Sequence, residues 1–154
     1  QVLNIEAPIV RNLLAKRILS AWGISKLGTR INAHFELLLN ESALNESKLD
    51  DSRVFWNETI KPDSYIGYRV SALNGQKRDA DDLPPEEIAN GIKEILSHQI
   101  SLPKDELVRE TSRLFGFARS GSNVENAMKK GIKMAIIRGF INEKEGRLII
   151  KEKI

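Results

Sequence analysis

The sequence predicts an α+β protein that is mainly α-helical, carries small β-hairpins and consists of two winged-helix domains in tandem. Three observations lead to this prediction: an internal repeat, glycines that end helical stretches at the same place in both copies, and short strand-like segments after the last helix of the second copy. The domains are expected at residues 1–71, truncated at the N-terminus, and at 84–154, with a polar linker at 72–83.

The internal repeat becomes visible when Gly23 is aligned with Gly116, an offset of 93 residues. Both copies then show an apolar helix, an aromatic residue, Gly, an apolar residue, a basic residue, a second Gly, Ser or Thr, and a β-branched residue, in that order. So many ordered matches indicate that one unit is duplicated. Trp22 matches Phe115, so both aromatic side chains are expected in a hydrophobic core.

The second copy begins with a helix at Pro85, whose first turn carries Glu86 and Glu87 at the positive end of the helix dipole. A short break at 101–103 precedes a second helix, which Gly116 is expected to end as a C-terminal cap. The spacing of apolar residues in both segments is that of amphipathic helices.

The third helix of the second copy is expected to start with a capping box, Ser122 with Glu125, and to run to about Arg138. Two short strands, 140–142 and 147–151, follow around a tight turn. This order of helix, helix, turn, helix and hairpin is the winged-helix arrangement, and it gives the fold prediction.

The first copy has the same middle, with Gln1 late in its opening helix, and we interpret the sequence as a fragment of a longer protein. An acidic, Asn- and Ser-rich insertion is expected at about 40–51, as a loop or short helix. The hairpin of this copy would pair Val54–Trp56 with Tyr65–Val70.

The net charge of +3 is unevenly distributed. Residues 101–154 carry 12 basic and 7 acidic side chains, whereas residues 41–100 carry 7 basic and 12 acidic ones. A basic last third favours an anionic polymer as partner. A surface covered with salt bridges explains the same numbers, and charge alone does not decide between the two.

The third helix of the second copy carries polar side chains along the ridge that faces away from its predicted core. Asn can bond two positions of an adenine edge, and Lys and Arg neutralise phosphates, so this ridge is the predicted DNA contact. The alternative is the ordinary polar face of a solvated helix. The candidate DNA-binding residues are Arg119, Asn123, Asn126, Lys130, Lys133, Arg147 and, as a weaker candidate in the first copy, Arg30.

The same ridge in the first copy is mostly apolar, with Ala33 and Leu37 in place of Asn126 and Lys130. An exposed leucine there favours contact with protein, so we expect this helix to pack on the insertion, on the second copy or on the parent protein. His34 is expected on the inward face.

Catalytic motifs are absent from the sequence. It contains no phosphate-binding loop, no nucleophile elbow, no cysteine and only two histidines. The aspartate pairs fall in predicted loops, which offer no held geometry for a metal. The chain is therefore predicted to have no catalytic residue, metal site or cofactor and not to be an enzyme.

No apolar stretch is long enough for a membrane helix, and the lack of cysteine fits a cytoplasmic protein.

Several stretches resemble the C-terminal region of large bacterial and archaeal superfamily 1 helicase-like proteins, and the later ones resemble a small domain of unknown function that ends those proteins. These stretches are 6–9, 13–18, 21–23, 28–31, 83–89, 114–117 and 119–122. In such parents an ATPase motor, often with a very-short-patch-repair-like nuclease domain, precedes this region. The resemblance implies an accessory DNA-binding module of a DNA repair or defence protein. The alternative is a protein-interaction adaptor that docks on the parent helicase and nuclease domains.

Overall fold

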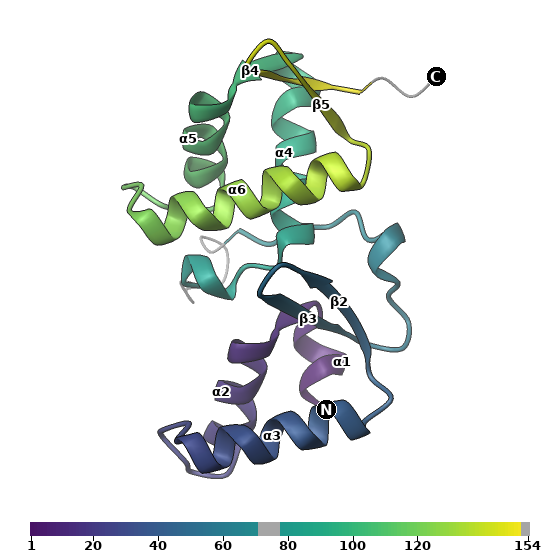
Figure 1. The fold of residues 1–154 in the computed structure, drawn as a ribbon, viewed down its shortest axis with the longest axis vertical. Coiled ribbons are helices and arrows are strands. Elements are labelled where there is room, and N and C mark those ends of the chain that lie inside the picture. Colours follow the sequence, from purple (N-terminus) through teal and green to yellow (C-terminus); the bar gives the residue numbers. More distant parts are fainter. Residues whose placement is uncertain (71–77, 152–154) are drawn as a thin grey trace. The chain divides into compact units, whose positions relative to one another are not determined.

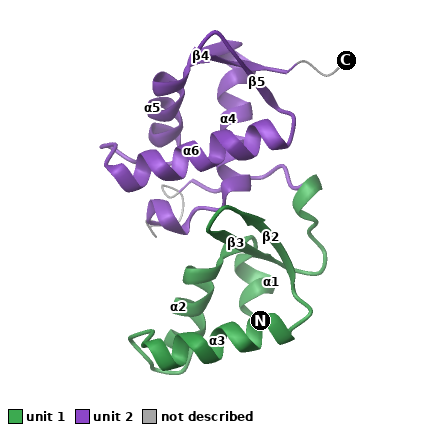
Figure 2. Ribbon diagram, viewed as in Figure 1, with its two compact units in different colours: residues 1–64 green, residues 65–154 purple. Residues whose placement is uncertain are grey.

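The computed structural model describes residues 1–70 and 78–151, and in these residues the fold is mixed α/β (Figure 1). The described part contains six α-helices and two small antiparallel sheets of three strands each. The chain divides into two compact units, residues 1–64 and 65–154 (Figure 2). Residues 72–77 of the expected linker lie outside the described residues.

The first unit contains three helices and one sheet. Its elements are α1 (Val2–Glu6), β1 (Ile9–Val10), α2 (Arg11–Ala21), α3 (Thr29–Glu41), β2 (Asn45–Leu49), β3 (Ser52–Trp56) and the short 3-10 helix η1 (Pro62–Ser64). The strand order in the sheet is β1-β3-β2. Val54, Phe55 and Trp56 of the central strand are almost completely buried and form the core together with α2.

The second unit repeats this order of helices and strands. Its elements are η3 (Ala80–Asp82), α4 (Pro85–Gln99), β4 (Ser101–Pro103), α5 (Lys104–Leu114), α6 (Ser122–Ile137), β5 (Ile141–Lys144) and β6 (Arg147–Ile150). The sheet order β4-β6-β5 corresponds to that of the first unit. The predicted break at 101–103 is therefore a strand, and Pro103 is tolerated in it because β4 lies at the sheet edge.

The repeat extends to the ends of the helices. Gly23 and Gly116 both have positive φ, 72° and 86°, as the residue after a helix often does. In each unit the N–H of the residue after this glycine donates to the carbonyl five residues earlier, at 2.9 Å. The helix end predicted at Gly116 is thus confirmed, and the first unit ends its second helix in the same way.

The start of α6 differs from the prediction. Gly121, with extended backbone, is the N-cap, and Ser122 is already helical without a side-chain capping bond. The carbonyl of Gly121 accepts the N–H of Glu125 at 3.0 Å. The capping box of Ser122 with Glu125 is therefore wrong, because the backbone at the glycine begins the helix one residue earlier than a serine cap requires.

The expectation of a loop or short helix at 40–51 is also wrong for most of this segment. Residues Asn45–Leu49 form β2, which pairs along its whole length with β3 and not with Tyr65–Val70. The strand was hidden by its polar sequence, since only Leu49 is buried on it. Ser47 fits the sheet because its hydroxyl accepts the indole N–H of Trp56 at 2.9 Å.

The second unit begins at Tyr65, earlier than the predicted boundary, because the segment before α4 is bonded to that helix. Glu87 is completely buried and accepts bonds from Arg69 Nε at 2.6 Å and Arg78 Nη2 at 2.7 Å. The Asn90 amide donates to the carbonyl of Tyr65 at 3.1 Å. A buried carboxylate needs such partners, so residues 65–70 and 78–84 are part of the second unit.

In the second unit α4 and α6 approach each other closely at Gly131. A Cβ added to Gly131 would lie 2.1 Å from Ile88 Cγ2, so only glycine permits this approach. Ile88, Ile92 and Leu96 of α4 are buried in the core. Phe115, which the repeat places in the core, is 2% exposed, as predicted.

Trp22 is 74% exposed, so its predicted core position is wrong. Its counterpart Phe115 is covered by α4, where a Cβ on Gly91 would lie 2.9 Å from the Phe115 ring. The first unit has α1 at the corresponding place, with five residues against the fifteen of α4. Among the described residues, no helix covers Trp22 as α4 covers Phe115.

The first unit is held by a cluster of charged side chains between its elements. Glu36 of α3 accepts bonds from Arg11 Nε of α2 at 2.6 Å and from Arg53 Nη1 of β3 at 2.7 Å. Arg53 Nη2 also donates to Glu46 of β2 at 2.8 Å. Burial alone would raise the pKa of Glu36, but the bonds and charges of Arg11 and Arg53 outweigh it, and the pKa is lowered.

Replacing Gly131 by alanine is expected to destabilise the protein by about 2 kcal/mol, because the new methyl group overlaps Ile88. Urea denaturation followed by circular dichroism measures this change. The same substitution in an Ile88→Ala background should cost far less, because the overlapping side chain is gone. Equal costs in both backgrounds would show that the α4–α6 contact is not the cause.

Because the pKa of Glu36 is lowered in the folded protein, its ionised carboxylate stabilises the fold at pH values above its ordinary pKa of 4.5. This stabilisation is lost as the pH falls through the lower pKa of the folded state. Glu36→Gln should therefore lower the melting temperature at pH 7 and flatten its decline below pH 4.5. Thermal unfolding of wild type and variant between neutral and acidic pH measures the difference. The pKa of Glu46 is lowered too, so a double variant with Glu46→Gln should flatten the curve further. An unchanged acid limb in both variants would contradict the assignment.

Candidate nucleic-acid interface

The outward face of α6 is the surface on which the sequence places DNA contacts. Of the predicted inward residues, Ala127, Met128, Gly131, Ile132 and Ala135 are buried and Val124 is half-buried, so the helix is oriented as expected. Of the predicted ridge, Asn123, Asn126 and Lys133 are exposed and Lys130 is half-buried. The structure thus brings four of the candidate residues to one helix, on the side away from its core.

Lys129 belongs to the same surface and was missed by the sequence analysis. It is exposed and lies three residues after Asn126 and four before Lys133, which places all three side chains on one helix face. Its Nζ lies 3.9 Å from the carboxylate of Glu125, a solvent-exposed pair of small energy. A helical wheel centred on the buried residues would have found Lys129.

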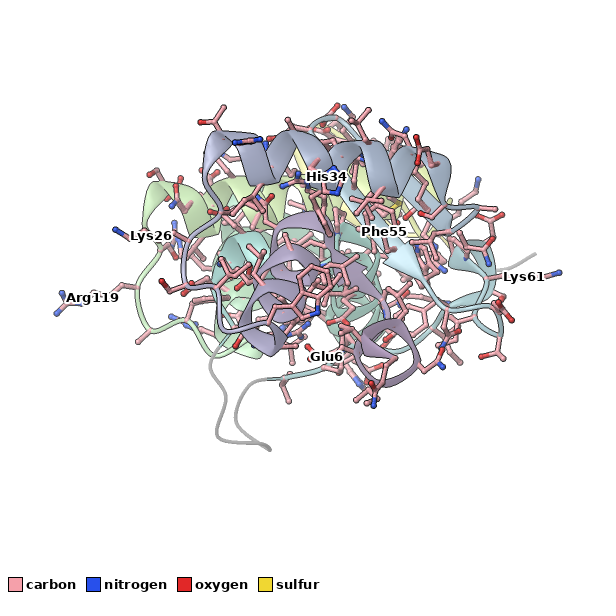
Figure 3. The ribbon with its side chains drawn as sticks, turned by 90° about the horizontal axis from the view of Figure 1, so that it is seen from below. Glu6, Lys26, His34, Phe55, Lys61 and Arg119 are labelled. Carbon is pink, nitrogen blue, oxygen red and sulfur yellow. The ribbon has the colours of Figure 1, made fainter. Side chains whose placement is uncertain are left out.

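Arg119 lies in the turn between α5 and α6, and its exposed side chain extends away from the body of its unit (Figure 3). This position is next to the N-terminal turn of α6, where backbone N–H groups favour anions. Arg119 can therefore reach a phosphate that also lies against the start of the helix.

Arg147 is at the start of β6 and is bonded within the sheet. Its guanidinium donates to the hydroxyl and the carbonyl of Ser101 in β4, each at 3.2 Å. Glu143 and Glu145 are exposed in the same hairpin and oppose a phosphate. The hairpin of the second unit is thus less suited to DNA contact than α6.

The C-terminal end of α6 differs from its polar beginning. Arg138 donates to Asn90 Oδ1 at 2.9 Å and to the carbonyl of Tyr65 at 2.7 Å, so its charge is engaged inside the unit. Ile136 and Ile137 next to it are exposed. Along α6, the polar surface that could meet a nucleic acid is therefore limited to residues 122–133.

In the first unit, Arg30 is exposed on α3, as are Ala33 and Leu37 on the same ridge. Leu37 is 59% exposed, which agrees with the expectation of an apolar ridge. His34, expected on the inward face, is exposed instead, whereas its counterpart Ala127 in the second unit is buried.

Neither a metal site nor a membrane helix emerges from the described ranges 1–70 and 78–151. No group of three His, Asp or Glu side chains there is arranged to hold a metal ion. Among these residues, no helix combines the length and apolar character needed to cross a membrane.

Fold and surface together define a mixed α/β protein of two similar units with a polar helix face on the second. Residues 1–33 match the model of a family described as "Protein of unknown function (DUF3320)". This match covers α1, β1, α2 and the start of α3, whereas the sequence resemblance placed a domain of unknown function in the later part of the chain. No curated protein and no solved structure matches the chain.

Proposed function

We propose that the chain is an accessory DNA-binding module of two tandem winged-helix domains, in which α6 of the second unit contacts DNA. The observation that carries the proposal is the outward face of α6, where exposed amide and ammonium side chains follow one another at helical spacing. The order of elements and strands in each unit supports the winged-helix assignment.

The lysine and asparagine side chains of α6 have different roles in this proposal. Lys129 and Lys133 neutralise backbone phosphates and release counterions, and Lys130 adds a third ammonium group. Asn123 and Asn126 are exposed amides that can bond base edges in a groove. Arg119 contacts a phosphate next to the start of the helix. Most of the affinity is therefore electrostatic, and sequence discrimination is small.

The longer protein to which we assign this module is proposed from the resemblance of the sequence to the C-terminal region of superfamily 1 helicase-like proteins. In that setting the chain acts in a cytoplasmic repair or defence enzyme, and the parent motor and nuclease domains carry out the catalysis. The match to a family of unknown function at residues 1–33 is compatible with this setting but names no activity.

The second candidate function is an adaptor for protein partners, with the parent helicase and nuclease domains as the partners. It is favoured by the exposed apolar side chains of α3, among them Ile31, Leu37 and Leu38. Fluorescence anisotropy of labelled duplex and forked DNA at two salt concentrations separates the candidates. Micromolar binding that weakens with salt supports the DNA module, and no binding at low salt favours the adaptor.

Replacing Lys130 and Lys133 together by glutamine is expected to lower the slope of log K against log salt by about 2, because two phosphate contacts are lost. Anisotropy titrations over a range of salt concentrations measure the slope. The matched control is Lys61→Gln with Lys104→Gln, which removes the same charge outside α6. A slope that stays at the wild-type value, or that falls equally in the control, argues against α6 as the contact.

Leu37→Lys tests the adaptor candidate. Because Leu37 is exposed within the first unit, the substitution should leave the melting temperature unchanged but reduce self-association at high concentration. Sedimentation velocity measures the association, and Ser20→Lys on α2 adds the same charge elsewhere as a control. If Leu37→Lys leaves self-association as it is in the wild type, the apolar face of α3 does not act as an adhesive surface.

A further inference from the structure

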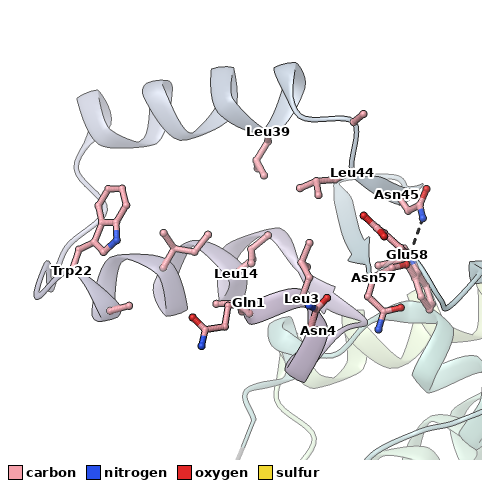
Figure 4. A pocket seen from close by; sticks show the side chains of 15 residues that line it. Gln1, Leu3, Asn4, Leu14, Trp22, Leu39, Leu44, Asn45, Asn57 and Glu58 are labelled. Carbon is pink, nitrogen blue, oxygen red and sulfur yellow. Dashed lines mark hydrogen bonds between the residues drawn. The ribbon is translucent and has the colours of Figure 1, made fainter.

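A groove of about 450 Å³ lies in the first unit between α3 on one side and α1 and α2 on the other (Figure 4). Its walls are mainly apolar. They include Leu3 of α1, Leu14 and Ile18 of α2, Trp22 at the end of α2, Leu39 of α3 and Leu44. A groove of this size and chemistry can bury several apolar side chains.

The corresponding surface of the second unit is covered by a helix. A Cβ on Gly91 of α4 would lie 2.9 Å from the ring of Phe115 and 3.0 Å from Leu114. The counterparts of these two residues in the repeat are Trp22 and Ala21, and both line the groove. The second unit therefore shows what kind of element fits this surface.

The position of α1 agrees with this comparison. α1 ends at Glu6 and α4 at Gln99, which is the offset of the repeat, so α1 corresponds to the last turn of α4. The groove lies where the earlier turns of α4 lie in the second unit, and Leu3 of α1 is one of its walls. The groove is thus a continuation of the surface on which α1 already packs.

We propose that this groove is the docking site of an amphipathic helix that runs directly into α1, with an apolar face like that of α4. The docked helix would cover Trp22, as α4 covers Phe115, and would complete the core of the first unit. Its occupant is a helix and not a flat protein surface, because the second unit places a helix on the same elements.

The shape of the first unit specifies the side chains of this helix. Leu38 stands where Gly131 stands in the second unit and is 47% exposed. Ile88 fits against α6 only because Gly131 has no side chain, so the docked helix needs a small residue at the position of Ile88. Trp22 is larger than Phe115, so the position of Gly91 must also stay small.

The test adds such a helix to the whole chain. The nine residues PEEAANGIK, which are 85–93 of α4 with Ile88→Ala, are placed directly before Gln1 in the register that α4 has with its last turn. Trp56 is buried, so quenching of fluorescence by acrylamide reports mainly on Trp22. We expect weaker quenching, emission at shorter wavelength and a melting temperature higher by about 5 °C.

The matched control carries PEEAANEKK, which has the same length and net charge but places charged residues on the face that enters the groove. It should leave Trp22 as accessible as in the unextended chain. Equal quenching of Trp22 in the two extended proteins would overturn the proposal. Protection of Trp22 in the unextended chain that grows with protein concentration would overturn it too, because a second copy would then cover the groove.

Discussion

The approach of α4 to α6 at Gly131 is the contact on which the second unit depends. Because glycine has no side chain, Ile88 enters the space beside α6, and α4 can cover Phe115 at the same time. The burial of α6 on this side leaves only its opposite face to solvent, and that face carries the amide and ammonium groups. In the first unit Leu38 stands in place of the glycine, and α1 corresponds only to the last turn of α4.

The order of the helices and the C-terminal ends of α2 and α5 were predictable from the sequence, because glycine after a helix and apolar residues at helical spacing are local signals. The strand Asn45–Leu49 was not predictable in this way, since its stability comes from pairing with β3 and from the Ser47–Trp56 bond. The prediction for Trp22 was wrong because the repeat predicts equivalent neighbours, whereas the described residues of the first unit include no counterpart of the α4 turns that cover Phe115.

The candidate site was predictable to the extent that it follows from helix geometry. The helical spacing of the inward residues fixes which side of α6 is buried, and the ridge residues therefore lie on its outward side. The sequence prediction omitted Lys129 because it took in a single ridge, whereas the outward face of α6 is wider than one row of side chains. The bond of Arg147 to Ser101 could not be foreseen, since β4 was read as a break and not as a neighbouring strand.

The guanidinium of Arg53 has a consequence for motion. It ties the hairpin of the first unit to α3 through Glu36 and to its own neighbouring strand through Glu46. In the second unit Arg147 is bonded to the adjacent strand of the same sheet instead of to a helix. We therefore expect the β2–β3 hairpin to move together with α3 as one rigid body. The β5–β6 hairpin, in contrast, can bend at its base without a movement of α6.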